Sequence, residues 1–139
     1  MSSTTRQGKC LCGAVTVTAV TASAHVGACH CSICRKWGGG PFMTVECGND
    51  VEFTGSDSIG VFNSSDWAER GFCRQCGTHL FYRLKEAVFY ALPIGLFDET
   101  AWVLTEEVFI DEKPDFYTFS QDTKKLTGAE LFAQFGADS

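Results

Sequence analysis

Three short cysteine clusters constrain this chain more than any other feature of its sequence. They contain seven of its eight cysteines: Cys10-Leu11-Cys12, Cys29-His30-Cys31-Ser32-Ile33-Cys34 and Cys73-Arg74-Gln75-Cys76-Gly77. The polar start of the chain, Met1 to Gln7, lacks the apolar stretch of a secretory signal. We therefore expect a reducing, cytoplasmic location, where clustered cysteines bind metal ions rather than form disulfides.

The spacing within each cluster directs pairs of sulfur atoms to one side of the chain. Residues i and i+2 of an extended segment share a face, so each of the first two clusters can present two sulfur atoms to one metal ion. The third pair, followed by Gly77, fits a tight knuckle in which glycine allows the required backbone angles. Zinc favours tetrahedral coordination by thiolates, so this pattern predicts zinc.

The seven clustered cysteines divide in two ways. In the simpler division, four close a structural zinc site and three hold a second zinc ion with an open fourth position. The four are Cys10, Cys12, Cys73 and Cys76, and the three are Cys29, Cys31 and Cys34. The rival division joins Cys31 and Cys34 to Cys73 and Cys76 as a ribbon. Spacing alone leaves both divisions open.

Several residues in and near the clusters have more than one interpretation. Cys47 belongs to no cluster, so it is either a small buried residue or a fourth ligand that closes the second site. His30 lies between two ligand cysteines, so on an extended chain its side chain points away from their metal ion. Arg35 and Lys36 either balance the charge of a thiolate centre or bind a carboxylate of the substrate.

Short segments of alternating apolar and polar residues predict a mostly β fold. Residues 13–21 alternate in this way, with Val15 and Val17 on one face. Similar segments, separated by Gly, Asn and Asp, follow at Pro41–Cys47, Asp50–Phe53, Ile59–Asn63, Arg70–Cys73, Thr78–Arg83, Ala87–Leu92 and Glu107–Ile110. Because no long helical crossover separates the strands, we expect antiparallel pairing.

Two helical segments are also expected. Thr127 with Glu130 matches a capping box, which predicts a short C-terminal helix that Gly136 can end. Ser32–Trp37 is expected to form a short turn or helix after the second cysteine cluster, and Gly38-Gly39-Gly40-Pro41 then breaks regular structure. The length of 139 residues fits a single domain, residues 1–139.

Charge and hydropathy argue against two classes of partner. The formal net charge is -6, and an acidic chain repels phosphate backbones, so we expect no binding to nucleic acid. No apolar run approaches the length of a membrane span, so we expect no membrane partner. Nothing in the sequence sets the oligomeric state.

Five stretches of the chain carry a resemblance to a known family: Gly8–Val15, Cys29–Lys36, Phe72–Leu80, Gly95–Asp98 and Phe109–Asp115. They resemble the glutathione-dependent formaldehyde-activating enzyme family. The resemblance implies a β-tent fold of short antiparallel sheets held by zinc. It also implies the four-plus-three division, with the structural zinc ion at the four cysteines and the catalytic one at the three. The activity it implies is that of a carbon–sulfur lyase joining glutathione and formaldehyde to S-hydroxymethylglutathione.

The charge of the open site suggests how such a reaction proceeds. The negative charge of three thiolates exceeds the positive charge of the zinc ion, so the centre is a weak Lewis acid. It is therefore better suited to binding a soft substrate thiol than to forming hydroxide from water. We expect a small thiol such as glutathione to enter the open position and add to an aldehyde carbon, with formaldehyde as the aldehyde. Asp66, Glu69 and His30 are candidate general bases. The alternative is a non-enzymatic, zinc-stabilised binding module in which both metal ions are structural.

Overall fold

The computed structural model describes residues 3–86 and 89–136. The chain divides into two compact units, which are described separately. The first unit comprises Met1–Ala24 and Thr44–Ala101, and the second comprises His25–Met43 and Trp102–Ser139. The expectation that residues 1–139 behave as a single domain stays a prediction.

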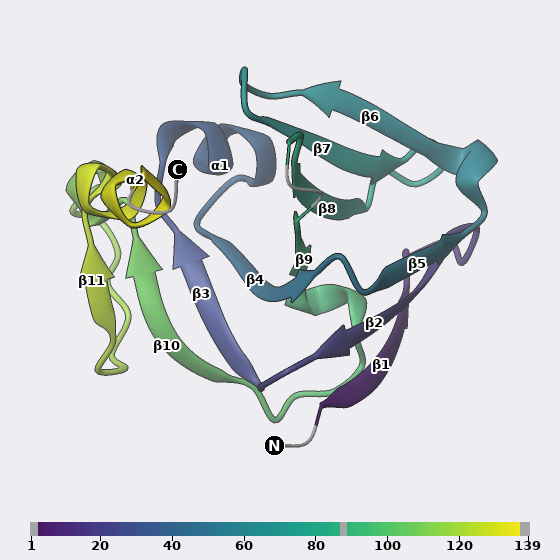
Figure 1. Ribbon diagram of the computed structural model, residues 1–139, viewed down its shortest axis with the longest axis horizontal. Helices are drawn as coiled ribbons and strands as arrows, with labels where there is room; N and C mark the ends of the chain where they lie inside the picture. The colour runs from purple at the N-terminus through teal and green to yellow at the C-terminus, as the bar shows by residue number, and fades with distance from the viewer. Residues whose placement is uncertain (1–2, 87–88, 137–139) are drawn as a thin grey trace. The chain divides into compact units, whose positions relative to one another are not determined.

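The first unit contains antiparallel β-structure in two groups of strands (Figure 1). One is a three-stranded sheet in the order β1 (Thr4–Lys9), β2 (Thr16–Thr21), β5 (Val51–Thr54). The other runs in the order β4 (Phe42–Gly48), β9 (Phe89–Pro93), β8 (His79–Leu84), β7 (Ala68–Cys73), β6 (Ile59–Asn63). Two single 3-10 turns, η1 (Ser56–Ser58) and η2 (Ile94–Leu96), join strands. Neighbouring strands are mostly close in sequence, which favours antiparallel pairing.

Alternating side chains build the core of the first unit. In β2, Val17 and Ala19 are buried, whereas Thr16, Thr18 and Val20 are more exposed. The rings of Phe53, Phe81 and Tyr90 pack together, with the Phe81 and Tyr90 centroids 5.4 Å apart in an edge-to-face arrangement. This core supports the strands from which the first and third cysteine clusters emerge.

The second unit is built around β10 (Val103–Val108), which lies between β3 (His25–Cys29) and β11 (Lys124–Leu126) (Figure 1). Both pairings of β10 are parallel, unlike the antiparallel pairing expected for the strands generally. A parallel pair needs a connection of about a dozen residues or more. The chain between β10 and β11 is long enough, and it contains η3 (Ile110–Glu112).

Two helices complete the second unit. The first, α1 (Ser32–Gly38), follows the second cysteine cluster and ends at Gly39, which has a left-handed conformation. The C-terminal helix, α2 (Gly128–Gly136), begins with the predicted capping box: the Glu130 N–H donates to the Thr127 hydroxyl at 3.1 Å, and the Thr127 N–H donates to the Glu130 carboxylate at 2.8 Å. The predictions of a mostly β fold and a short C-terminal helix are therefore confirmed.

The boundaries of several strands differ from the predicted ones. Three strands, β1, β3 and β11, were not predicted, because their sequences are polar or short. The predicted strand Glu107–Ile110 instead ends at Val108, since Phe109 has a positive φ of 54° that turns the chain into η3. The predicted strand Ala87–Leu92 is seen from Phe89 onward, and its first two residues lie outside the described residues.

None of the helices among residues 3–86 and 89–136 is long and apolar enough to cross a membrane.

Candidate metal centres

The first unit brings together four cysteine side chains from two distant parts of the sequence. Cys10 and Cys12 follow β1, and Cys73 and Cys76 lie at the end of β7 and in the turn after it. Their four sulfur atoms all lie within 4.8 Å of one another. We call this group the four-cysteine centre.

Sulfur separations in the four-cysteine centre suit a zinc ion. The Sγ atoms of Cys10 and Cys12 are 3.6 Å apart, and those of Cys12 and Cys73 are 3.8 Å apart. A tetrahedron with zinc–sulfur bonds of about 2.3 Å has sulfur–sulfur edges of about 3.8 Å. The donor set and its spacing therefore fit zinc.

Hydrogen bonds favour the thiolate forms of Cys10 and Cys76; for Cys10, burial raises the pKa but the hydrogen bonds lower it overall. The Val15 and Gln75 N–H groups donate to the Sγ atoms of Cys10 and Cys73, each at 3.4 Å. Hydrogen bonds from the Thr78 hydroxyl and backbone lower the pKa of Cys76 to about 5. A lowered thiol pKa helps a metal ion to compete with protons for the sulfur.

Thr78 also ties the two ligand-bearing segments together. Its hydroxyl lies 3.1 Å from the Cys76 sulfur and accepts a hydrogen bond from the Leu11 N–H, also at 3.1 Å. Gly77, with a φ of 81°, supplies the left-handed conformation that the knuckle requires. Its N–H donates to the Cys73 carbonyl at 2.8 Å, which closes the turn.

The second unit brings together Cys29, Cys31 and Cys34, whose sulfur atoms also lie within 4.8 Å of one another. We call this group the three-cysteine centre. Cys29 ends β3, and Cys31 caps α1, because its sulfur accepts a hydrogen bond from the Cys34 N–H at 3.3 Å. The first turn of α1 thus brings the Cys34 sulfur close to the sulfur atoms of Cys29 and Cys31.

The chemistry of the three-cysteine centre favours a bound cation. The neighbouring thiols of Cys31 and Cys34, together with burial, raise the pKa of Cys29. Three adjacent thiols cannot all ionise unless a positive charge offsets their repulsion. A divalent, thiol-preferring ion such as zinc provides that charge, so these residues also fit zinc.

The two centres contain the groups of the predicted four-plus-three division and not those of the ribbon. Cys47 belongs to neither centre among the described residues. It lies in the first unit, where it is buried and its thiol donates to the Val45 carbonyl at 3.6 Å. Burial raises the pKa of Cys47 to about 11, so it stays a neutral thiol. This environment suits a small apolar residue.

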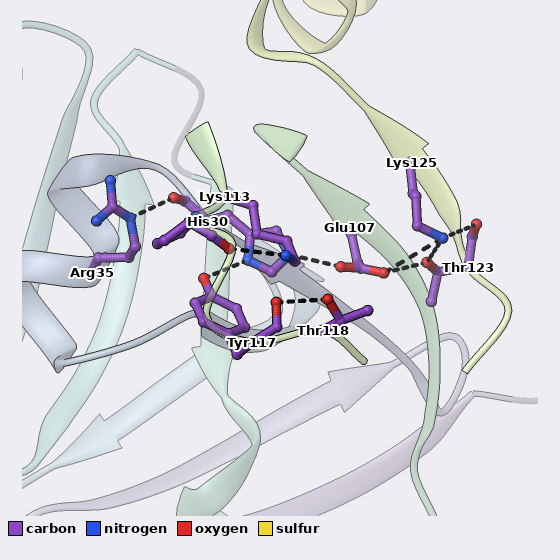
Figure 2. Close-up of polar contacts among 9 residues, drawn as sticks. His30, Arg35, Glu107, Lys113, Tyr117, Thr118, Thr123 and Lys125 are labelled. Atoms are coloured by element: carbon purple, nitrogen blue, oxygen red, sulfur yellow. Dashed lines mark hydrogen bonds and ion pairs between the residues drawn. The ribbon is translucent and has the colours of Figure 1, made fainter. Parts of the chain in front are cut away.

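His30 is held by hydrogen bonds on both sides of its ring (Figure 2). The side chain is fully buried, with Nε2 2.8 Å from a Glu107 carboxylate oxygen and Nδ1 2.8 Å from the Tyr117 hydroxyl. Both ring nitrogens therefore have oxygen atoms as partners. Their partners explain why His30 is not among the residues grouped in the three-cysteine centre.

The ionisation of Glu107 sets the direction of its hydrogen bond with His30. Burial raises the pKa of Glu107, but hydrogen bonds from Thr123 and His30 outweigh this effect, so the pKa is lowered overall. An ionised carboxylate only accepts hydrogen bonds, so Nε2 of His30 must donate. Burial raises the pKa of Tyr117, which keeps its hydroxyl protonated and able to donate to Nδ1.

The predicted carboxylate-binding residues lie on α1. Arg35 is half-buried, and its Nε donates to the His30 carbonyl at 3.0 Å (Figure 2). Lys36 is exposed to solvent. Of the candidate general bases, Asp66 and Glu69 lie in the first unit, and Glu69 forms an ion pair with Arg83.

Sequence reasoning missed Glu107, Tyr117 and Thr123, which surround His30. Glu107 stands beside Val108 in a predicted strand, and a carboxylate on its buried face was a signal that a partner must exist. Tyr117 and Thr123 lie in a segment without regular structure, and no local motif marks them.

The fold and the two centres define a class: a mostly β protein with separate clusters of four and three cysteines able to hold metal ions. The chain belongs to the glutathione-dependent formaldehyde-activating enzyme family, whose model matches residues 5–112.

Relatives in other organisms agree with this assignment. The chain is 33% identical over 127 residues to an uncharacterised lyase of Schizosaccharomyces pombe, covering 90% of this chain and 93% of that protein. It is 36% identical over 103 residues to a Podospora anserina protein named for glutathione-dependent formaldehyde activation. That match covers 68% of this chain and 48% of the relative, so the chain spans about half the relative's length.

A solved structure supports the fold. The crystal structure of a Rhodobacter sphaeroides protein matches with a TM-score of 0.59 at 22% identity, covering 68% of this chain and 89% of that one.

Proposed function

We propose that this protein is a zinc-dependent carbon–sulfur lyase that interconverts a small thiol plus an aldehyde with their hydroxyalkyl thioether adduct. The substrates that best suit it are glutathione and formaldehyde. The proposal is supported by membership of the family and by a relative that is named as a lyase.

The observation that carries the proposal is the number of sulfur atoms in the second centre. Among the described residues, this group contains three cysteines and no further His, Cys, Asp or Glu side chain. Zinc favours four ligands, so three protein ligands leave a position for a substrate. The four-cysteine centre supplies a full set and suits a structural role.

The reaction needs modest assistance from the chain. The substrate sulfur donates an electron pair to the aldehyde carbon, a carbon–sulfur bond forms, and the carbonyl π electrons move to oxygen. The thiol proton ends on that oxygen, and cleavage of the adduct reverses each of these changes. Zinc, when held by Cys29, Cys31 and Cys34, would lower the pKa of the thiol by binding its sulfur.

Residues on α1 are proposed to bind the charged parts of the thiol. Glutathione carries carboxylates, and Arg35 and Lys36 follow Cys34 directly. The hydrogen bond from Arg35 Nε to the His30 carbonyl fixes the guanidinium beside the ligand-bearing segment. Lys36 is exposed and offers a second positive charge. Together they are proposed to orient the substrate, which supplies part of the rate enhancement by proximity.

The test combines catalysis with metal spectroscopy. Exchange of glutathione and formaldehyde with their adduct would be followed at equilibrium by NMR, using zinc-loaded protein. We expect faster exchange with the wild-type chain and with Cys47→Ala, and no acceleration with Cys31→Ser. Cys47→Ala is the matched control, because it removes a thiol that belongs to neither centre.

Cobalt substitution tests direct binding of the thiol. Glutathione should change the thiolate-to-cobalt absorption of the loaded protein, and S-methylglutathione, which has no free thiol, should leave it unchanged. If glutathione has no effect while both metal ions remain bound, the proposal fails and the binding-module alternative is favoured.

A further inference from the structure

His30 stands between two proposed zinc ligands, and four different residues hold its polar groups. Its backbone N–H donates to the Val108 carbonyl at 3.1 Å, and its carbonyl accepts from Arg35 Nε at 3.0 Å. Its ring nitrogens each lie 2.8 Å from a partner, one on Glu107 and one on Tyr117 (Figure 2). The residue is fully buried, so any rotation would break buried hydrogen bonds.

The placement of His30 fixes the residues on either side of it. Because the peptide bonds on either side of His30 are planar, its φ and ψ angles set how the backbones of Cys29 and Cys31, and hence their Cα–Cβ bonds, are placed relative to each other. A metal ion accepts its ligands only within narrow limits of distance and angle. Holding His30 therefore holds two of the three sulfur atoms of the three-cysteine centre.

The network that holds His30 extends to the C-terminal part of the chain. Glu107 accepts a second hydrogen bond from the Thr123 hydroxyl, and the Lys125 ammonium lies 3.8 Å from the same carboxylate (Figure 2). Tyr117, Thr123 and Lys125 all lie beyond residue 112, where the match to the family model ends. Tyr117 thus contacts the ligand-bearing segment directly through His30, and Thr123 and Lys125 are connected to it through Glu107.

We propose that His30 is a positioning residue for the three-cysteine centre, and that Glu107 and Tyr117 hold its ring so that Cys29 and Cys31 keep the spacing a metal ion requires. His30 acts through its neighbours and is neither a ligand nor the general base. The inference rests on the proposed function only in requiring that the three-cysteine centre binds a metal ion.

The test measures the metal affinity of the two centres separately. Cadmium-113 NMR gives distinct resonances for three-sulfur and four-sulfur sites, and Cys29→Ser and Cys73→Ser assign them. Glu107→Leu removes both carboxylate oxygens and puts a branched apolar side chain in their place. We expect it to weaken metal binding at the three-cysteine centre by about 10–100-fold and to shift that resonance. The four-cysteine centre should keep its affinity and its resonance.

Milder variants keep the inference open to refutation if Glu107→Leu folds poorly. Glu107→Gln retains an acceptor for the His30 Nε2–H, so it should restore affinity to nearly the wild-type value. Tyr117→Phe removes only the hydroxyl, and we expect a smaller loss, confined to the three-cysteine centre. Val26→Ala, which removes buried apolar atoms in β3 without touching His30, should destabilise the protein but leave the resonance in place.

The outcomes separate this inference from the proposed function. If the wild-type chain binds no metal ion at the three-cysteine centre, the proposed function fails. If the wild-type centre binds its ion but Glu107→Leu and Tyr117→Phe bind it equally well, only the positioning role is overturned. Equal weakening of both centres would also overturn it, because a general loss of stability would then explain the result.

Discussion

Replacing Glu107 tests how much the buried network contributes to folding. The carboxylate is almost fully buried and accepts hydrogen bonds from His30 and Thr123. In Glu107→Leu, the His30 Nε2–H loses its acceptor inside the protein, which costs about 1–3 kcal/mol. Loss of the bond from Thr123 costs about 0.5–1.5 kcal/mol. The pair with Lys125 adds little, because that ammonium is half-exposed.

These contributions predict a loss of about 1.5–4.5 kcal/mol in the free energy of unfolding. The assay is urea unfolding at neutral pH in excess zinc, so that both centres stay filled. Glu106→Ala is the control, since Glu106 is the neighbouring residue on the opposite face of β10 and should change stability by less than about 1 kcal/mol. A loss below about 1 kcal/mol for Glu107→Leu would refute this reasoning.

The same carboxylate predicts a pH dependence. Because the pKa of Glu107 is lowered in the folded protein, its contribution is fully present above the ordinary value of 4.5 and is lost as the pH falls below it. Glu107→Gln cannot titrate, so it should flatten the decline in unfolding free energy on the acid side. An unchanged acid limb in Glu107→Gln would show that Glu107 does not contribute in this way.

Two further substitutions test the first unit. Gly71→Ala would place a methyl group against the Phe81 ring and should lower the free energy of unfolding by about 1–3 kcal/mol, measured by urea denaturation. In the control, Gly95→Ala, the added methyl group meets no atom within 4 Å, so the free energy of unfolding should hardly change. Equal losses in the two variants would contradict the packing of Phe81 against Gly71. Thr78→Val removes the hydroxyl that lowers the pKa of Cys76, so zinc should be released from the four-cysteine centre at lower chelator concentration. Unchanged release would contradict that role.

The sequence predicted the parts of the fold that depend on local patterns. Alternation in residues 13–21 identified β2, and the capping box at Thr127 identified α2, because both signals lie within a few residues. The parallel pairing of β10 was not predicted, since pairing between distant strands depends on packing that no local pattern records.

In the candidate site, too, the sequence predicted what depends on local spacing and missed what depends on distant contacts. Cysteine spacing predicted metal binding, because pairs two or three residues apart can present their sulfur atoms to one ion, but it left the four-plus-three division and the ribbon open. The resemblance to the family favoured the four-plus-three division, whose two groups the fold brings together. Spacing also indicated that the His30 ring would point away from the sulfur atoms. It could not name Tyr117, which is 87 residues away and contacts the ring only in the folded chain.

We propose that the chain holds one zinc ion in a closed site and another in a site with a vacant position. Zinc content per chain, measured by native mass spectrometry on the wild type, Cys29→Ser and Cys73→Ser, tests it most directly. We predict two ions for the wild type and one for each variant, with the remaining ion at the other centre. A wild type that retains a single ion, or a Cys29→Ser variant that still retains two, would contradict the account.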